Sequence, residues 1–522
     1  MLVGGYAAHI DGMLSPEDYR MRVTDLVAAL AAENGGASKA ATAVSVLGGD
    51  GGEFSGLAYD SRSVRRGNLF AAIRGFNQDG HRYAADAVRR GAAVLLVDHP
   101  LADLAATQVV VPDTRRAFAA AAAAFYRHPS RELNVCGITG TNGKTTTTFL
   151  VDSILRAAGR RSAVIGTLGV QVDGAPVEFH ATTPTTPEAS DLQRLLRDMR
   201  DRGVQDVTME VTSHALELER AAGCRFVTAV FTNLTQDHLD LHGTFEAYRD
   251  AKARLFAMVE PDGVSIVNAD DPYGEAMIRA SRAPAWTYGI EGSARIRAEG
   301  LSFSPRGTGM TLVWPEGRAP LALPLPGRFN VSNALAAFAV GLSRGVPAET
   351  MTRVLESTPG VPGRFEPVDE GQPFAVIVDY AHTPDSLEQV LRLSSEISPG
   401  RRIVVFGCGG DRDRTKRPIM GRIGTTLADY AFFTSDNPRS EDPEAILREI
   451  EAGVPGARNF TSEADRRLAI EQAVALARPG DVVVIAGKGH ETYQIVGDQV
   501  IDFDDRAVAR EVLRARCAGK TP

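Results

Sequence analysis

A glycine-rich segment between an apolar stretch and a threonine-rich stretch constrains the fold of this 522-residue chain more than any other feature. Residues 134–148 are Asn-Val-Cys-Gly-Ile-Thr-Gly-Thr-Asn-Gly-Lys-Thr-Thr-Thr-Thr. The pattern predicts a strand over 133–138, then a loop, then a helix that begins near Lys144. In this arrangement backbone N–H groups and the helix N-terminus converge on phosphate oxygens. We therefore expect a phosphate-binding loop on a parallel α/β sheet.

The loop is a variant of the common phosphate-binding pattern. Ile138 stands where that pattern has its first glycine, and Gly137 and Gly140 flank it. A tight strand-to-helix turn without a ligand would also explain the glycines, but the strand before the loop and the helix after it favour phosphate binding. In that case Lys144 would place its charge on the β- and γ-phosphates of a nucleotide, and the Thr145 hydroxyl would bind Mg²⁺.

Two breaks in the pattern of elements divide the chain. A predicted alanine-rich helix over 116–126 ends at a His-Pro-Ser-Arg segment, and a Pro/Gly-rich segment at 358–363 ends the central run of strands and helices. Because a domain usually spans ~100–200 residues, about three domains fit this length. We expect an N-terminal extension at 1–20 and domains at 21–131, 132–357 and 358–522.

Short apolar runs indicate the architecture of the last two domains. Predicted strands alternate with helical periodicity in the central domain, at 163–165, 207–211, 227–231 and 264–267. In the third domain the strands are continuously apolar, which implies helices on both faces of the sheet. They lie at 375–378, 403–406 and 481–485. We expect an α/β protein of three domains, with a central P-loop-type parallel sheet and a C-terminal Rossmann-like domain.

Charge, cysteine content and hydropathy exclude several classes of protein. The net charge of −8 provides no global field that would attract nucleic acid or an anionic membrane. The four cysteines are isolated and fit a reducing compartment. The N-terminus has no basic segment before an apolar one, and no apolar run reaches the ~18 residues of a membrane span. We expect a cytoplasmic protein that neither binds nucleic acid nor enters a membrane.

Lys252 lies on the apolar stripe of a predicted helix over 245–259. Tyr248, Leu255 and Phe256 recur on the same face at helical spacing. A lysine that faces inward must be paired, neutralised or chemically modified, because an unpaired buried ammonium is too costly. Alternatively, its stem follows the surface and its charged head reaches solvent, and spacing alone favours this second arrangement.

Polar residues gather after two predicted strands of the central domain. Glu210 lies at the end of one strand, where ligand sites of parallel α/β sheets form. A loop after the next strand holds two acidic residues and two histidines: Asp237, Asp240, His238 and His242. Histidine with oxygen ligands suits Mg²⁺ or Mn²⁺ better than zinc, and a helix-capping loop is an equally good explanation.

Taken together, these motifs resemble the Mur ligases over nearly the whole chain, from Asp60 to Asp505. The matching segments are 139–145, 210–214, 237–238, Lys252, 327–333, 379–384, 409–413, 436–439 and 487–491. The resemblance implies an ATP-dependent amide ligase of peptidoglycan precursor synthesis. It implies that meso-2,6-diaminopimelate is joined, through an acyl phosphate, to the D-Glu γ-carboxylate of UDP-MurNAc-L-Ala-D-Glu. We expect a monomer whose domains close around ATP.

The resemblance also implies how the nucleotide and two Mg²⁺ ions are held. Lys252 would carry a CO₂-derived carbamate, which turns a buried cation into an anionic metal ligand. Thr145 and Glu210 would bind one Mg²⁺, and the carbamate with His238 would bind the second, so Lys144, Lys252 and His238 are the catalytic candidates. Contacts to ATP are implied for Gly140, Thr141, Asn142, Gly143, Lys144, Thr145, Thr146, Asn333 and His382.

Two further sets of residues match substrate contacts of the family. Contacts to the UDP-sugar dipeptide are implied for Ser61, Asn77, Gln78, Thr185, Thr186, Thr212 and Arg220. Contacts to diaminopimelate are implied for Arg412, Asp436, Asn437, Pro438, Arg439, Gly487 and Glu491. The Arg439 guanidinium can bind the distal carboxylate, which lysine lacks, through two parallel hydrogen bonds. On turn chemistry alone, residues 436–439 would be a plain Asn-Pro turn.

Two other functions compete with this hypothesis. A sister ligase would use lysine or a folate-type polyglutamate substrate. A P-loop regulatory ATPase would hydrolyse ATP without any amine, but it would leave Lys252 and residues 436–439 without a purpose. The glycines at 407–410 superficially resemble a dinucleotide-binding loop, yet Arg412 stands where the last glycine of that motif belongs.

Overall fold

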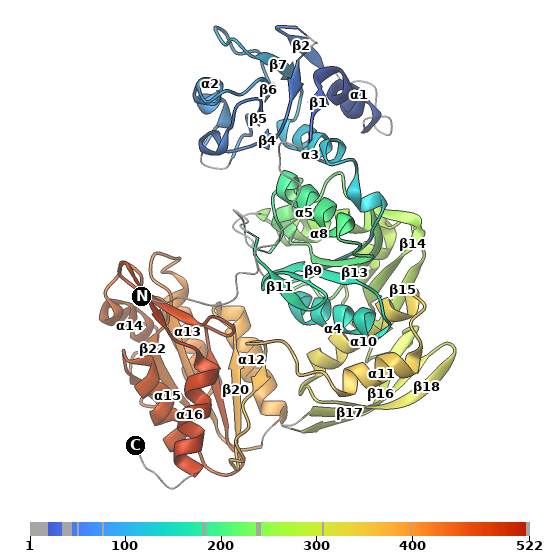
Figure 1. The fold of residues 1–522 in the computed structure, drawn as a ribbon. Coiled ribbons are helices and arrows are strands. Elements are labelled where there is room, and N and C mark those ends of the chain that lie inside the picture. The colour runs from blue at the N-terminus through green and yellow to red at the C-terminus, as the bar shows by residue number, and fades with distance from the viewer. Residues whose placement is uncertain are drawn as a thin grey trace. The chain divides into compact units, whose positions relative to one another are not determined.

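The structure is a computed structural model that describes residues 19–33, 44–49, 52–75, 78–179, 183, 185–235, 242–304, 307–397 and 399–517. The chain divides into two compact units. The first contains Met1–Tyr288 and Ala336–Thr350, and the second contains Gly289–Leu335 and Met351–Pro522. Figure 1 shows the elements of both units, which are described one at a time below. The domain limits expected near 131 and 357 stay predictions.

The first unit begins with a small five-stranded sheet of order β2-β7-β6-β5-β4. Its strands are β2 (Ser45–Leu47), β4 (Leu57–Ala58), β5 (Leu69–Ala71), β6 (Val94–Val97) and β7 (Thr107–Val110). All pairs are parallel except β2 with β7. The strand β1 (Met21–Arg22) pairs with β3 (Glu53–Phe54), and the helices are α1 (Val23–Glu33), α2 (Ala84–Arg89) and α3 (Thr114–Phe125). The predicted alanine-rich helix is confirmed as α3, which the Asp113 carboxylate caps.

A larger sheet of the first unit carries the glycine-rich loop. Its strand order is β11-β10-β9-β12-β8-β13-β14-β15. The strands are β8 (Asn134–Thr139), β9 (Ser162–Gly166), β10 (Gly169–Val172), β11 (Ala175–Val177), β12 (Asp206–Glu210), β13 (Phe226–Phe231), β14 (Val259–Asn268) and β15 (Ala285–Gly289). The six strands from β9 to β15 in this order are parallel, whereas β10 and β11 are antiparallel. The predicted parallel α/β sheet is confirmed.

The chain reverses direction across this sheet at β8. From β8 it crosses to β9, returns to β12, and then continues on the opposite side of β8 with β13. Such a switch point opens a crevice at the carboxyl ends of the strands, where ligands of α/β proteins bind. The connecting helices are α4 (Lys144–Ala157), α5 (Ala189–Asp201), α6 (Ser213–Glu217), α8 (Phe245–Ala257) and α9 (Gly274–Ala280).

The second unit contains an antiparallel meander and a six-stranded sheet. The meander consists of β16 (Ile296–Ser304), β17 (Gly307–Trp314) and β18 (Gly317–Leu323), and α10 (Arg328–Ser343) and α11 (Ala348–Glu356) follow it along the chain. The sheet has the order β19-β20-β24-β21-β22-β23, and its pairs are parallel except β19 with β20. Its strands are β19 (Glu366–Pro367), β20 (Ala375–Asp379), β21 (Arg402–Cys408), β22 (Tyr430–Ser435), β23 (Phe460–Ser462) and β24 (Val482–Ala486).

Helices cover both faces of the six-stranded sheet, as its continuously apolar strands predict. On one face Val404 and Phe406 pack with α12 (Pro384–Ile397), α13 (Lys416–Leu427) and α14 (Pro443–Glu451). On the other, Ile403 and Val405 pack with α15 (Arg466–Leu476) and α16 (Asp505–Cys517). A hairpin of β25 (Tyr493–Val496) and β26 (Gln499–Asp502) lies between β24 and α16 along the chain.

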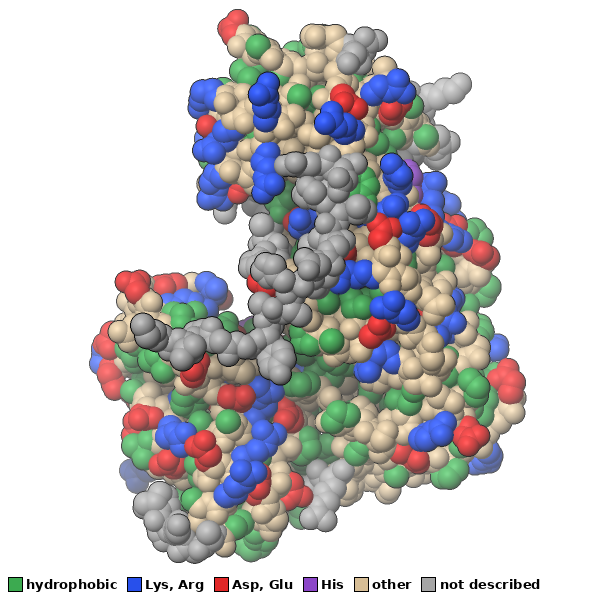
Figure 2. Space-filling view, viewed as in Figure 1, with side chains coloured by type: hydrophobic (Ala, Val, Ile, Leu, Met, Phe, Trp, Pro, Cys, Tyr) green, Lys and Arg blue, Asp and Glu red, His purple; other side chains and the backbone are tan. Residues whose placement is uncertain are grey.

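On the face drawn in Figure 2, basic and acidic side chains lie beside one another over most of the surface. Among the residues that the structure describes, no helix is both long enough and apolar enough to span a bilayer.

Candidate functional site

The glycine-rich loop lies at the switch point of the larger sheet. As predicted, the strand before it ends at Thr139 and the helix after it begins at Lys144. Gly140 and Gly143 have φ angles of 150° and 83°, which residues with a side chain rarely adopt. A Cβ atom on Gly140 would overlap with the Thr232 hydroxyl. Glycine is therefore required at this position.

The residues that follow β13 fix the loop from its side. The Thr141 N–H donates to the Asn233 carbonyl at 2.9 Å, and the Asn233 side chain bonds both the N–H and the carbonyl of Asn142, at 3.0 and 3.1 Å. Thr232 Oγ1 donates to the same Asn142 carbonyl at 2.6 Å. These contacts hold the backbone of the loop in place without a ligand. Sequence reasoning missed Thr232 and Asn233, although both follow a strand that neighbours the phosphate strand.

Lys144 folds back over its own loop. Its ammonium donates to the carbonyls of Gly140 and Thr141, each at 2.9 Å. Thr145 and Thr146 are buried in the first turn of α4. The loop therefore brings together the lysine, the hydroxyl groups and the helix N-terminus that phosphate binding requires.

Lys252 is buried, with 1% of its surface exposed. Its ammonium donates to the Gly140 carbonyl at 2.9 Å and lies 4.5 Å from the centroid of the Tyr248 ring. The Tyr248 hydroxyl is 3.1 Å from Thr141 Oγ1, so α8 contacts the phosphate loop through two side chains. The arrangement that spacing alone favours, with the head of Lys252 in solvent, is wrong because α8 presents this residue to the loop.

Glu210 is buried at the carboxyl end of β12, opposite Ile138 of β8. Its carboxylate accepts hydrogen bonds from the Thr167 N–H at 2.9 Å and from the Thr167 hydroxyl at 3.1 Å. A Cβ atom on Gly166 would overlap with this carboxylate, so the glycine makes room for it. Asp237, His238 and Asp240 lie outside the described residues. The His242 ring is 5.1 Å from that of Tyr248.

The threonines predicted to contact the UDP-sugar dipeptide form one network beside Glu210. The Thr186 hydroxyl donates to the Glu210 carbonyl at 2.9 Å and accepts from the Thr212 N–H at 3.2 Å. The Thr185 and Thr167 hydroxyls are 3.1 Å apart. Thr212 also caps α6 through the Ala215 N–H. These hydroxyls therefore share partners with the predicted metal ligand.

Arg220 joins this network at its edge. Its guanidinium donates to the Thr186 carbonyl at 3.4 Å and forms a 2.8 Å ion pair with Glu188, a partner that sequence reasoning did not find. Near the small sheet, Ser61 is buried in the 3₁₀ helix η2 (Ser61–Ser63), and Gln78 Oε1 accepts from the Tyr83 hydroxyl at 2.9 Å. Asn77 lies outside the described residues.

The predicted amino-acid site occupies the carboxyl ends of β22 and β24 in the second unit. Asn437 Nδ2 donates to Glu491 at 2.9 Å. The ammonium of Lys488, which is fully buried, contacts both Asn437 Oδ1 and Glu491 Oε2 at 3.2 Å. Gly487 has a φ of 119°, and a Cβ atom there would lie 2.6 Å from the Asp436 carboxylate. Residues 436–439 are thus part of a polar network and not a plain turn.

A buried ion pair anchors the two strand ends of this site. The side chains of Arg466 and Asp505 are fully buried and meet through two hydrogen bonds of 2.7 Å. Arg466 also donates to the carbonyls of Ser435 and Ala486, the residues just before Asp436 and Gly487. These bonds hold the backbone where the loops at 436–439 and 487–491 begin. Removing either partner of the ion pair would leave an uncompensated buried charge.

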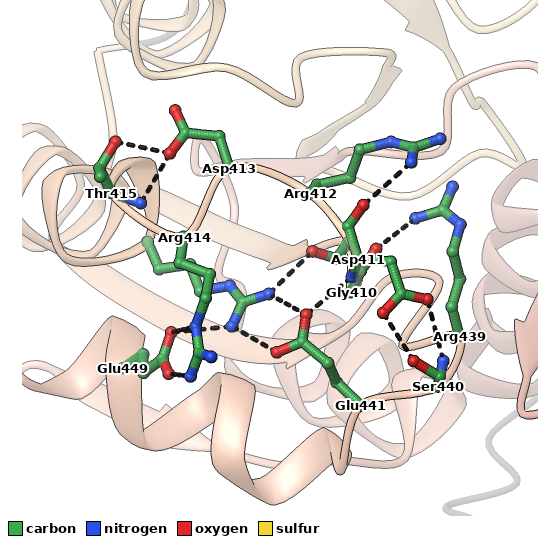
Figure 3. A network of polar contacts seen from close by, with 12 residues as sticks. Gly410, Asp411, Arg412, Asp413, Arg414, Thr415, Arg439, Ser440, Glu441 and Glu449 are labelled. Carbon is green, nitrogen blue, oxygen red and sulfur yellow. Dashed lines mark hydrogen bonds and ion pairs between the residues drawn. The ribbon is translucent and has the colours of Figure 1, made fainter. Parts of the chain in front are cut away.

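The side chains of the two candidate arginines of this site lie beside the same glycine. A Cβ atom on Gly409 would lie 3.0 Å from Arg439 Nη1 and 3.8 Å from Arg412 Cγ. Arg439 Nη1 donates to the Gly410 carbonyl at 2.8 Å, and Arg412 Nη1 donates to the Asp411 carbonyl at 3.0 Å (Figure 3). Two guanidinium groups on this loop, together with the Glu491 carboxylate that Asn437 binds, suit a ligand that carries both carboxylate and ammonium groups.

The residues expected to contact the ATP nucleoside belong to the second unit. Asn333 is buried on α10, and its amide is 3.5 Å from Asn330 Oδ1. His382 is exposed, and its Nδ1 is 2.8 Å from the Tyr380 carbonyl. Their contact with a nucleotide held by the loop of the first unit stays a prediction.

The fold and these residues define an α/β protein with a glycine-rich loop before a helix N-terminus in the first unit and a polar network at the ends of parallel strands in the second. Three family profiles match the chain: the Mur ligase middle domain at 138–341, the Mur ligase glutamate ligase domain at 363–489, and the Mur ligase family catalytic domain at 53–127. The chain belongs to the Mur ligase family.

Relatives and a solved structure agree with this assignment. A UDP-N-acetylmuramoyl-L-alanyl-D-glutamate–2,6-diaminopimelate ligase of Geobacillus thermodenitrificans is 49% identical over 88% of this chain and 95% of its own. A ligase of the same name from Bacillus velezensis is 47% identical over 88% and 94%. A solved structure of a ligase of that name has 34% identity and a TM-score of 0.65, and the match covers 89% of this chain and 95% of the other.

Proposed function

We propose that the protein is an ATP-dependent amide ligase that joins meso-2,6-diaminopimelate to the D-Glu γ-carboxylate of UDP-MurNAc-L-Ala-D-Glu in peptidoglycan precursor synthesis. The observation that carries the substrate assignment is that the Arg412 and Arg439 side chains both bind the backbone of the loop at 409–411, while Asn437, two residues before Arg439, binds the Glu491 carboxylate. These groups match an amino acid with a carboxylate and an ammonium at its distal end. The names of the similar ligases support the same substrate.

The chemistry has two steps, because a carboxylate is a poor electrophile. The γ-phosphoryl group of ATP passes to an oxygen of the D-Glu γ-carboxylate, which gives an acyl phosphate and ADP. The amine of diaminopimelate then attacks the acyl carbon and loses a proton, and the tetrahedral intermediate expels phosphate. Lys144 and the N–H groups of the loop would offset the charge on the transferred group, which is the main protein contribution to phosphoryl transfer.

The side chains near the loop fit the two Mg²⁺ ions of the proposal. The Thr145 hydroxyl and the buried Glu210 carboxylate are oxygen donors, which Mg²⁺ prefers. A carbamate on Lys252, together with His238, would form the second set of ligands. Bound Mg²⁺ would neutralise phosphate charge and align the phosphate oxygens. Carbamylation would also give the buried Lys252 side chain an anionic group, and the carbamate N–H could still donate to the Gly140 carbonyl.

The UDP-sugar dipeptide would bind along the threonine network and Arg220, with Ser61, Asn77 and Gln78 on the uridine side. The hydrogen bond from the Thr186 hydroxyl to the Glu210 carbonyl supports this placement. It puts the threonines that would bind the dipeptide beside Glu210, which would bind Mg²⁺. The proposal includes a monomeric, cytoplasmic enzyme. Sedimentation of the purified protein would check the oligomeric state.

A ligation assay tests this function directly. Purified protein is given ATP, Mg²⁺ and UDP-MurNAc-L-Ala-D-Glu, with meso-diaminopimelate or L-lysine, and ADP and the nucleotide-linked tripeptide are measured together. We expect ADP and tripeptide in equal amounts with diaminopimelate and little product with lysine. A preference for lysine would show that the protein is a lysine-adding sister ligase. ATP hydrolysis that needs no amine would support a regulatory ATPase.

Replacement of Arg439 by alanine is expected to raise the KM for diaminopimelate by about 30–150-fold, the equivalent of ~2–3 kcal/mol for a bidentate charged contact. The KM for ATP should change less than about twofold, because Arg439 contacts only the amino-acid site in this proposal. Steady-state kinetics with each substrate varied in turn gives these values. Equal increases in both constants would argue against a role for Arg439 in binding the distal carboxylate.

A further inference from the structure

The guanidinium groups of Arg439 and Arg412 both donate to backbone carbonyls of one short loop, residues 409–411. Arg439 donates to the Gly410 carbonyl and Arg412 to the Asp411 carbonyl. Gly410 packs directly against the tetrapeptide, since a Cβ atom there would overlap with the Pro438 carbonyl. The positions of these two carbonyls therefore decide where the two guanidinium groups point.

The loop and the tetrapeptide each contain a residue in a strained conformation. Asp411 and Arg439 have φ angles of 53° and 52°, in the left-handed region. For residues other than glycine this conformation is unfavourable, less so for Asp than for Arg, and it persists where the surroundings impose it. Without such support the two residues would relax, and the Gly410 and Asp411 carbonyls would move.

Three sets of hydrogen bonds join the loop at 409–411 to residues 437–441, the segment that contains Arg439. The Asp411 carboxylate accepts from the Ser440 hydroxyl at 2.6 Å and from the Ser440 N–H at 3.2 Å. The Asp411 N–H donates to Glu441 Oε1 at 2.7 Å, and the Gly410 N–H donates to the Asn437 carbonyl at 2.9 Å. Figure 3 shows Asp411 between Ser440 and Glu441. The network thus extends to the Glu441 side chain.

Arg417, in the first turn of α13, holds Glu441 in this position. Its side chain is fully buried and donates to both oxygens of Glu441, at 2.8 and 2.9 Å. It also donates to the Gly409 carbonyl at 3.2 Å and to Glu449 at 2.8 Å. Hydrogen bonding from Arg417 lowers the pKa of Glu441 to about 2, so this carboxylate stays ionised at neutral pH. Arg417 therefore supports the loop both at Gly409 and through Glu441.

We propose that Arg417 is a positioning residue for amino-acid selection: it holds the loop at 409–411 in the strained conformation that directs Arg412 and Arg439 at the distal carboxylate of the substrate. This inference rests on the proposed function and deepens it. Arg417 itself would not contact diaminopimelate, because its side chain is buried and its guanidinium is committed to Glu441, Glu449 and Gly409. Its effect on the substrate passes through the carbonyls of Gly410 and Asp411.

The chain offers a matched control in Arg414. This arginine also pairs with Glu449, but 63% of its side chain is exposed. Its described hydrogen bonds go to Glu449 and not to the loop at 409–411. Substitution of Arg414 therefore removes a guanidinium from the same cluster without removing the support of the loop.

The test compares the variants Arg417→Met, Arg417→Lys, Glu441→Gln and Arg414→Met by steady-state kinetics and thermal unfolding. We expect Arg417→Met to raise the KM for diaminopimelate by about 10–50-fold and to lower the preference for diaminopimelate over lysine by a similar factor. The KM values for ATP and the UDP-sugar dipeptide should change less than about twofold. Arg417→Lys should restore part of the loss, and Arg414→Met should match the unsubstituted enzyme.

Glu441→Gln keeps the inference testable if Arg417→Met does not fold, because this variant retains an oxygen acceptor for the Asp411 N–H and loses only the charged pairing. We expect it to raise the KM for diaminopimelate by about fivefold, with the other two KM values unchanged. Equal increases for all three substrates, or no change in either variant, would overturn the role of Arg417. If the unsubstituted enzyme did not use diaminopimelate, that result would instead contradict the proposed function.

Discussion

Replacement of Lys144 by alanine is expected to reduce turnover by about 10²–10³-fold, because one preorganised electrostatic contact to a developing charge contributes ~3–4 kcal/mol. The Lys144 ammonium lies over the phosphate loop on the carbonyls of Gly140 and Thr141. Those carbonyls would hold it where the γ-phosphoryl group arrives. The measurement is ADP and tripeptide formation at saturating concentrations of all three substrates.

The control for this variant is Arg156→Ala in the last turn of the same helix. Arg156 forms an ion pair with Asp152 and is partly exposed, so its loss affects α4 without touching the loop. We expect its turnover to stay within about twofold of the unsubstituted enzyme. If Lys144→Ala retained a tenth of the normal rate or more, the loop would not act as the site of phosphoryl transfer.

Replacement of Lys252 is expected to lower turnover by about 10²–10³-fold. How much activity a small carboxylic acid restores should depend on whether the new side chain leaves a cavity. A carbamate would be an anionic group at the end of a buried side chain, so its removal costs electrostatic stabilisation of the magnitude seen for other active-site contacts. Lys252→Ala leaves a cavity beside Gly140 and Tyr248 that a short carboxylic acid can enter. Acetate or propionate should therefore restore part of the activity.

Lys252→Met is the matched variant, since the methionine side chain fills the same space and leaves no room for the acid. It should be as slow as Lys252→Ala and gain nothing from added acetate. A separate readout is the carbamate carbon in the unsubstituted protein, detected by NMR after equilibration with ¹³C-labelled bicarbonate. Normal turnover in the methionine variant, or a labelled protein without the carbamate signal, would contradict the carbamate hypothesis.

Much of the architecture could be predicted from the sequence because it depends on local patterns. The glycine-rich segment predicted a strand that ends before Gly140 and a helix that begins at Lys144, and both are present. Continuous apolar strands in the third domain predicted helices on both faces of a sheet, and two apolar clusters on those faces confirm it. In both cases neighbouring residues determine whether a segment forms a strand or a helix. Burial on one or both faces then determines how apolar residues repeat along that segment.

The supports of the amino-acid site could not be predicted in this way. Arg417, Lys488 and Arg466 are charged residues that are fully buried in the fold. In a sequence each is one of many surface-type residues, because most of its partners lie far along the chain. The exception is the Glu491 carboxylate, three residues after Lys488. Asp505, for example, follows Arg466 by 39 residues. Long-range pairing of this kind is decided by packing and leaves no local signal.

The sequence by itself determined the glycine-rich loop between a strand and a helix, the parallel sheets and the identity of the residues at their carboxyl ends, because spacing and chemical type suffice for these. Only the tertiary structure decided that Lys252 faces inward, against the expectation from spacing, since the contact with Gly140 brings together residues 112 positions apart. It also decided that Arg412 and Arg439 converge on one loop. Their direction depends on strained backbone that distant side chains hold in place.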